Sequence, residues 1–132
     1  MPTTLMETAT THGVEVSVES FYLPDHSAPE ENRYVFAYRI RLKNHSEVMV
    51  KLLRRHWIIT DSNGEVNEVK GVGVVGEQPI LTPGGEYEYT SGSHLKSPMG
   101  TMHGTYEMLT HTAENIEVTI PCFSLEVPGV LN

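Results

Sequence analysis

Residues 69–81 read VKGVGVVGEQPIL, and this stretch decides between two fold classes. Its glycines Gly71, Gly73 and Gly76 match the Gly-x-Gly-x-x-Gly pattern of a dinucleotide-binding loop. Such a loop requires a helix that begins at its second or third glycine, so that the helix N-terminus meets the pyrophosphate. Pro79 follows too closely for that helix, because proline lacks an amide donor and breaks a helix. The glycines therefore lie in an all-β context.

Apolar side chains recur at every second position on both sides of this stretch, which is typical of half-buried strands. The alternation is seen in residues 14–18, 34–42, 87–91, 102–108 and 116–120. Arg39, Arg41 and Lys43 stand at intervening positions, so one face of their strand meets water. No segment of ten or more residues keeps a helical period. Many short strands joined by turns predict an all-β fold of the β-sandwich class.

A bend, a hairpin turn and a β-bulge are predicted within or between these strands. Residues 48–61 form either two short strands or one bent strand. Asn63-Gly64 predicts a type I′ hairpin turn, because both residues accept a positive φ. After Pro121-Cys122 the alternation resumes out of phase, which predicts a β-bulge with Pro121 on an edge strand and Cys122 as a small apolar filler.

The chain has 132 residues and a formal net charge of −8, and these values bound its class. The length fits one domain, 1–132, with a core at about 14–128. The acidic balance disfavours nucleic acids and anionic membranes as partners. Cys122 is the single cysteine, which excludes an intrachain disulfide and a thiolate metal cage. Without a basic, apolar N-terminal segment or a long apolar run, we expect a cytoplasmic protein.

Several blocks of the sequence, in this order and spacing, resemble the ApaG family. They are RYVFAYRIRL (33–42), RHWIITD (55–61), NG (63–64), GVGVVGEQP (71–79), PG (83–84), YEYTSG (87–92), PMGTMHGTYEM (98–108) and IPCF (120–123). The resemblance spans residues 14–128. It implies an immunoglobulin-like, fibronectin type III-like β-sandwich and, for free-standing bacterial members, a cytosolic location.

The resemblance also implies a role type. Bacterial members are linked genetically to cobalt resistance and magnesium efflux, and the glycine motif has been discussed as a phosphate or pyrophosphate binder. In eukaryotes the same domain is attached to F-box proteins and to a polymerase-associated protein, where it resembles a protein-interaction module. No catalytic constellation is agreed for the family. The resemblance therefore implies a fold and a binding role rather than a reaction.

The glycine segment has two interpretations. In the first, backbone amides form a nest for a phosphate and neighbouring cations assist. This candidate phosphate site consists of Gly71, Gly73, Gly76, Lys70, Arg54 and Arg55. In the second, Gly73 and Gly76 allow a bulge or tight crossing while Val72, Val74 and Val75 fill the core. The second is favoured, because a glycine triplet without its helix is a weak signal.

A second candidate site is a flat apolar patch for a protein partner. Its candidate members are Gln78, Pro79, Met99, Met102 and Gly104. It would use the methionines and the close approach that a strand glycine allows.

Catalytic and metal sites have weaker support. Ser91, Ser93 and His94 lack an orienting carboxylate for nucleophilic catalysis, and His94, His103 and His111 lack a recognised ligand spacing. We therefore expect no metal, no cofactor and no enzymatic activity. The predicted function is a non-enzymatic binding module for an unknown protein partner, and the chain is a monomer or, through its edge strands, a homodimer. The alternative is a binder of pyrophosphate or a nucleotide phosphate at the loop from Gly71 to Gly76.

Overall fold

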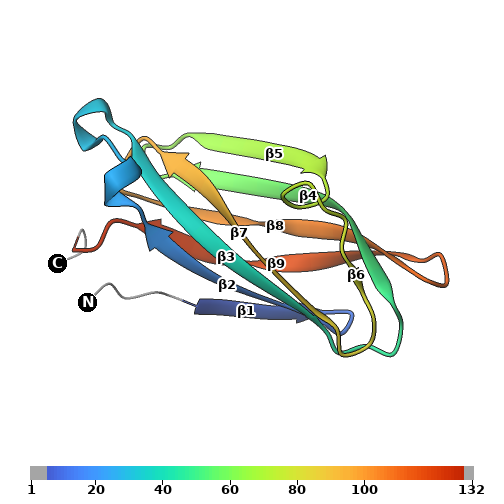
Figure 1. The fold of residues 1–132 in the computed structure, drawn as a ribbon. Helices are drawn as coiled ribbons and strands as arrows, with labels where there is room; N and C mark the ends of the chain where they lie inside the picture. Colours follow the sequence, from blue (N-terminus) through green and yellow to red (C-terminus); the bar gives the residue numbers. More distant parts are fainter. Residues whose placement is uncertain (1–5, 130–132) are drawn as a thin grey trace.

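Two antiparallel β-sheets lie face to face in the computed structural model, which describes residues 6–129 (Figure 1). The first sheet has the order β1-β2-β3-β7, with β1 at Met6–Thr11, β2 at Val14–Tyr22, β3 at Tyr34–Asn44 and β7 at Glu86–Leu95. The second has the order β5-β4-β8-β9, with β5 at Val66–Val72, β4 at Val50–Asp61, β8 at Met99–Thr110 and β9 at Asn115–Glu126. The short β6, Ile80–Leu81, also pairs with β4, and two 3-10 turns, η1 at Pro24–His26 and η2 at Pro29–Glu31, lie between β2 and β3. The predicted immunoglobulin-like, fibronectin type III-like β-sandwich is confirmed.

The core lies between the two inner sheet faces and forms one cluster of buried side chains. Tyr38 of β3, Trp57 of β4 and Phe123 of β9 meet there, with ring centroids 5.3 to 5.9 Å apart. The hydroxyl groups of Tyr89 and Tyr106 hydrogen-bond to each other and so join β7 to β8 across the core. Burial raises the pKa of both phenols, so both stay neutral near pH 7. Among residues 6–129, every buried side-chain nitrogen and oxygen has a hydrogen-bond partner.

Two bulges bend the strands of the second sheet. Residues 50–61 form one bent strand, because the β4–β8 register shifts between Leu52 and Arg54. The predicted bulge near Pro121 is also present: Met102 pairs with Phe123 and Gly104 pairs with Ile120 on β9, an edge strand. The expectation for Cys122 is wrong, because its side chain is exposed rather than a core filler.

The turns differ from the expected types. Asn63 does not adopt a positive φ, while Gly64 has φ of +96°. Asp61 donates its N–H to Glu65 O at 2.8 Å, so the hairpin has a longer loop with a glycine bulge instead of a type I′ turn. A two-residue turn with two positive φ values does occur at His12 and Gly13, where it joins β1 to β2. The sequence patterns did not predict β1.

Long apolar helices do not occur in the described part of the chain, and none of its helices is of a kind that crosses a membrane.

Candidate functional site

The strand β5 is an edge of the second sheet, and on one side it pairs with β4. Gly73 donates its N–H to Leu53 O at 2.8 Å just beyond one end of β5, and Asp61 donates to Glu65 O at 2.8 Å at the other end. The register between these two bonds is constant. Backbone groups of an antiparallel strand point alternately to its two sides. The odd-numbered residues of β5 therefore hydrogen-bond to β4, and the even-numbered residues point the other way.

The outward residues are Val66, Glu68, Lys70 and Val72. Their backbone N–H and C=O groups point away from β4, and within residues 6–129 no other strand pairs with that side of β5. The one protein donor to these carbonyls in the described part of the chain is the Arg55 guanidinium, whose Nη1 bonds Val72 O at 3.2 Å. We call this row of backbone groups the β5 edge.

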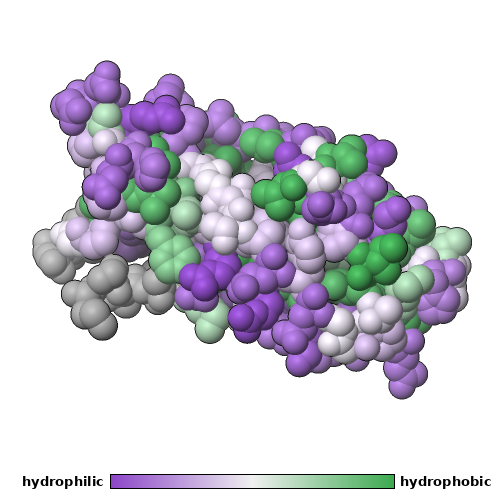
Figure 2. All heavy atoms as spheres, in the orientation of Figure 1, coloured by the Kyte–Doolittle hydropathy of each residue, from purple (hydrophilic) through white to green (hydrophobic). Residues whose placement is uncertain are grey.

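Large apolar side chains are exposed along the β5 edge and in the segment that follows it. The exposed fractions are 61 % for Val66, 40 % for Val69, 62 % for Val72, 55 % for Val75 and 57 % for Ile80. Figure 2 shows hydrophobic atoms in green along the top of the molecule, where Figure 1 places β5. Exposed apolar residues that gather on an open edge strand are typical of a binding surface or of an aggregation hazard.

A cavity of about 600 Å³ opens between the two sheets beneath the β5 edge. Its floor is made by buried or half-buried side chains of the core, namely Tyr38, Trp57, Ile59 and Met102. Asn67 and Val69 of β5 and Ser91 and Ser93 of β7 form part of its rim. Charged or titratable side chains also line the cleft, namely Arg55, Glu65, Glu68, His94 and Lys96. We call this cavity the edge cleft. A strand added to β5 would direct every second side chain into it, because side chains alternate between the two faces of a sheet.

The glycine segment forms a small hairpin instead of a phosphate nest. Val74 and Glu77 exchange backbone hydrogen bonds of 2.8 and 2.9 Å around a two-residue turn at Val75 and Gly76, whose φ values are +42° and +82°. Gly73 uses its N–H to bond Leu53 O. The convergence of three glycine amides that the phosphate interpretation requires is therefore not formed.

The valines of this segment also differ from expectation. Val74 is fully buried, but Val72 and Val75 are exposed and do not fill the core. The positive φ of Val75 is strained, because a β-branched side chain crowds the backbone in the left-handed region.

Gly71 lies in β5 opposite Arg55 and makes room for its side chain. A Cβ at Gly71 would stand 2.7 Å from the guanidinium carbon. The guanidinium donates from Nη1 to Val72 O at 3.2 Å and to Gly73 O at 2.9 Å. Arg55 therefore holds the end of β5 to the glycine hairpin.

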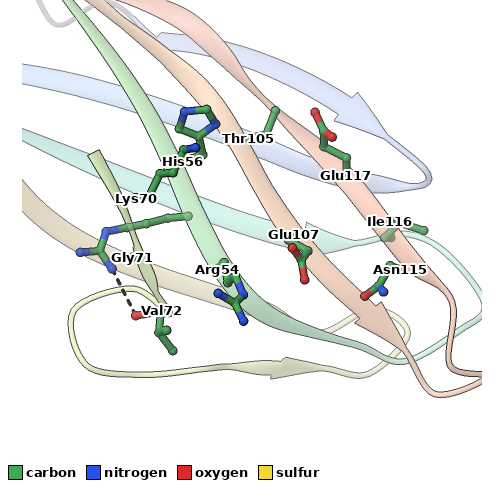
Figure 3. Close-up of a pocket in the computed structure, with 11 residues that line it drawn as sticks. Arg54, His56, Lys70, Gly71, Val72, Thr105, Glu107, Asn115, Ile116 and Glu117 are labelled. Carbon is green, nitrogen blue, oxygen red and sulfur yellow. Dashed lines mark hydrogen bonds between the residues drawn. The ribbon is translucent and has the colours of Figure 1, made fainter. Parts of the chain in front are cut away.

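A second cavity of about 600 Å³ lies on the outer face of the second sheet (Figure 3). It gathers Arg54, Arg55, Lys70 and Gly71 of the predicted phosphate site but is not lined by Gly73 or Gly76. His56, Thr105, Glu107, Asn115, Ile116 and Glu117 complete most of its wall. We call this cavity the outer groove.

Acidic side chains partly neutralise the outer groove. His56 Nε2 lies 2.5 Å from Glu68 Oε1, and Lys70 Nζ lies 3.5 Å from the same oxygen. The hydrogen bond from His56 and the charge of Lys70 lower the pKa of the Glu68 carboxyl. Glu107 and Glu117 also line the groove, so its cations do not stand alone.

The predicted interaction patch is not formed. Met102 is 1 % exposed and belongs to the core. A Cβ on Gly104 would overlap the His56 carbonyl oxygen. The missing side chain at Gly104 therefore allows β4 to lie close to β8 and does not make room for a protein partner.

The remaining members of the predicted patch lie near opposite ends of β4. Gln78 Nε2 donates to Leu53 O at 3.1 Å, and Pro79 O accepts from Leu52 N at 3.0 Å. Met99 precedes Gly100, which pairs with Asp61 at the far end of β4. At about 3.3 Å per residue, the two groups are about 25 Å apart.

The serine and histidine residues of β7 do not come together. Ser91 and Ser93 share the inner face with the buried Tyr89 and Leu95, whereas His94 is exposed on the opposite face. Among residues 6–129, no group of three or more histidine, cysteine or acidic side chains is placed to hold a metal ion.

The β5 edge was not predicted from the sequence patterns. Val66, Val69 and Val72 stand three residues apart, so they fall on both faces of a strand and match no simple alternation. This irregular spacing was the available signal. That β5 lies at the edge of a sheet depends on strand order, which sequence patterns do not contain.

Comparisons with known proteins agree with this fold. The family model described as the ApaG domain matches residues 24–110. The chain is 51 % identical over 126 residues to Protein ApaG of Sinorhizobium fredii, covering 96 % of this chain and 97 % of the relative. It is 54 % identical over 123 residues to Protein ApaG of Paramagnetospirillum magneticum, covering 93 % and 95 % of the two chains.

Solved structures show the same similarity. A crystal structure of a Bordetella pertussis protein named for ApaA superimposes with a TM-score of 0.86 at 42 % identity, covering 98 % of this chain and 100 % of that one. The X-ray structure of a structural-genomics target gives a TM-score of 0.85 at 44 % identity, with 89 % of each chain covered. The chain belongs to the ApaG domain family.

Proposed function

We propose that this domain is a non-enzymatic protein-binding module that takes an extended polypeptide segment along the β5 edge. The observation that carries the proposal is the exposure of Val66, Val69 and Val72 on a strand whose outward backbone groups lack a strand partner within residues 6–129. Addition of a strand to such an edge supplies affinity through main-chain hydrogen bonds and specificity through alternate side chains.

The surroundings of the edge define the segment that fits. Side chains on one face of an added strand would enter the edge cleft, whose floor includes the aromatic rings of Tyr38 and Trp57. Side chains on the other face would lie beside Lys70, Glu68 and the outer groove. The partner segment should therefore alternate apolar residues with charged or polar residues.

Val75 supports a binding role for this end of the strand. It is 55 % exposed and has φ of +42°, so it combines backbone strain with an unburied apolar side chain. Strain of this kind costs on the order of 1–3 kcal/mol and is concentrated at functional sites. Neither property benefits the folded domain by itself.

The test uses proline at an outward residue. Lys70→Pro removes an N–H that points away from β4, so it blocks strand addition without breaking a bond of the sheet. Lys70→Ala is the matched control, because it removes the same charge and keeps the N–H. Peptides selected from a random phage-displayed library on the wild-type domain should bind Lys70→Ala and should fail to bind Lys70→Pro.

Amide NMR identifies the surface that a selected peptide covers. Binding should slow hydrogen exchange at the amides of Val66, Glu68, Lys70 and Val72, whose N–H groups point outward. Equal binding of the peptides to Lys70→Pro, or shifts confined to another face, would contradict the proposal.

The outer groove favours a second candidate function, the binding of pyrophosphate or a nucleotide phosphate. It brings together Arg54, Lys70 and His56, which are groups that bind phosphate oxygens. Titration with pyrophosphate and with ATP, each with and without magnesium or cobalt, tests this candidate by amide NMR. Saturable shifts around Arg54 and Lys70 that disappear in the Arg54→Ala, Lys70→Ala double variant would support it. A lack of shifts at millimolar ligand would leave protein binding as the function. In that case, we infer that any role in cobalt resistance or magnesium efflux acts through the bound protein partner.

A further inference from the structure

The residues of β5 are nearly symmetric about their centre. The strand reads VNEVKGV, with Val69 in the middle, Glu68 and Lys70 on either side, and Val66 and Val72 at the ends. If two copies of this strand run antiparallel about a two-fold axis at Val69, Glu68 of one copy lies opposite Lys70 of the other. Val66 then lies opposite Val72.

We propose that the β5 edge binds the β5 edge of a second copy of this chain, in the register centred on Val69. This inference rests on the proposed function, because it names the polypeptide that the edge takes. The two charged residues and the two end valines all belong to the outward set. The strand pair formed by the two copies therefore contains Val66 opposite Val72 twice and Glu68 opposite Lys70 twice, and each of these four residue pairs exchanges two backbone hydrogen bonds. The second sheets of both copies then form one continuous sheet.

Other registers are less favourable. A shift by one residue places outward residues opposite residues whose backbone groups already bond to β4. A shift of the axis to Glu68 or to Lys70 places like charges directly opposite each other, which is destabilising. A further shift leaves part of the outward set without a partner. The register centred on Val69 is the one that pairs opposite charges and uses every outward residue.

The side chains around the axis are compatible with this joint. Val69 faces the rim of the edge cleft and is 40 % exposed. At the axis it meets the Val69 side chain of the second copy in a non-hydrogen-bonded pair, where opposed side chains are closest. Val72 O already accepts a hydrogen bond from Arg55, and a carbonyl oxygen has a second lone pair for the Val66 N–H of the second copy.

The decisive experiment exchanges charges between two variants. Glu68→Lys alone places lysines opposite lysines at both charged pairs, and Lys70→Glu alone places glutamates opposite glutamates. Each variant should therefore dimerise at least about tenfold more weakly than the wild type, whose dimer has twice the chain mass of 14.7 kDa. Mixed together they should form a heterodimer, because both charged pairs are then opposite in sign. Sedimentation equilibrium and native mass spectrometry measure these species.

Cysteine crosslinking tests the register. In a Cys122→Ser background, Val69→Cys places two thiols on the axis at a Cα separation of about 4.5 Å, which a disulfide can bridge. Asn67→Cys is the control, because its two copies would be about 13 Å apart along the joint. The Val69→Cys dimer should crosslink under oxidising conditions, and the Asn67→Cys dimer should not. A crosslink that forms in the Asn67→Cys variant alone would overturn the proposed register.

The outcomes separate this inference from the proposed function. A wild-type chain that remains monomeric at millimolar concentration, or a charge-variant mixture that forms no heterodimer, overturns self-pairing. If library peptides still depend on the outward N–H of Lys70 in that case, the edge binds a different polypeptide and the proposed function stands. If the wild-type dimer forms and Lys70→Pro abolishes it while Lys70→Ala does not, self-pairing through the β5 edge is supported.

Discussion

Arg55 occupies the space that a side chain at Gly71 would fill, since a Cβ there would stand 2.7 Å from the guanidinium carbon. The guanidinium uses this space to reach Val72 O and Gly73 O. Gly71, the first glycine of the motif, thus makes room for the Arg55 side chain. This relationship explains why a glycine stands inside an edge strand, where it otherwise weakens pairing.

Gly71→Ala should displace Arg55 and reduce the free energy of unfolding by about 1 kcal/mol. The loss of two charge-assisted hydrogen bonds destabilises the folded state, and the lower conformational entropy of the unfolded alanine variant offsets part of this loss. Arg55→Ala should cost a similar amount. In the double variant the two costs should not add, since both changes remove the same interaction. Urea denaturation of the four proteins in this cycle provides the measurement. Additive costs would show that Gly71 has a role independent of Arg55.

Gly73 and Gly76 should respond differently to substitution by alanine. Both have positive φ values, +66° and +82°, so either change introduces strain of about 1–2 kcal/mol. A Cβ on Gly73 would also overlap the Glu77 carbonyl oxygen, whereas Gly76 has open space. Gly73→Ala should therefore cost about 3 kcal/mol or more and Gly76→Ala about 1 kcal/mol. Thermal melting curves should show this order, and equal losses would mean that overlap at Gly73 is relieved by backbone movement.

Val75→Asn should stabilise the domain by about 1 kcal/mol, because asparagine tolerates the left-handed conformation and is common in tight hairpin turns. The exposed valine contributes little burial in exchange. Val75→Thr is a suitable control, since it adds polarity but keeps the β-branch and the strain. The melting temperature should rise for Val75→Asn and stay nearly unchanged for Val75→Thr. A rise in both would attribute the gain to polarity.

Asp61 should make stability depend on acidic pH. The residue is 4 % exposed. Burial raises its pKa, but hydrogen bonds from Ser97 Oγ and from the backbone amides of Lys96 and Asn63 outweigh burial and hold the pKa below its usual value. A lowered pKa in the folded state stabilises the protein above the unfolded-state pKa of about 3.9, and this contribution is lost as pH falls through the folded pKa.

Asp61→Asn should therefore lose about 2 kcal/mol at pH 7, because a charged acceptor of several hydrogen bonds becomes a neutral amide. The difference from the wild type should shrink as pH falls below about 4. Urea denaturation at a series of pH values measures it. A difference that stays constant from neutral pH down to about pH 2.5, below the unfolded-state pKa, would show that packing, and not charge, accounts for the loss.

The local alternation of apolar and polar residues was sufficient to predict most strands and one β-bulge. The alternation around Tyr38 and Ile40 predicted the inner face of β3, and the break in phase at Pro121 predicted the bulge in β9. These features follow from the two-residue period of a strand, which is visible along the chain. The turn at Asn63 was different, because hydrogen bonds to Asp61 and Glu65 select its conformation from several that asparagine permits.

Neighbours along the chain are enough to predict the all-β class, the buried faces of β2, β3, β7, β8 and β9, and the exclusion of a dinucleotide loop by Pro79. Contacts between distant parts of the chain instead place Met102 in the core, bring Arg55 into the space beside Gly71, and leave β5 at the edge of a sheet. The order of strands is set by long-range packing of the two sheets. The same packing therefore decides which backbone groups remain open to a partner.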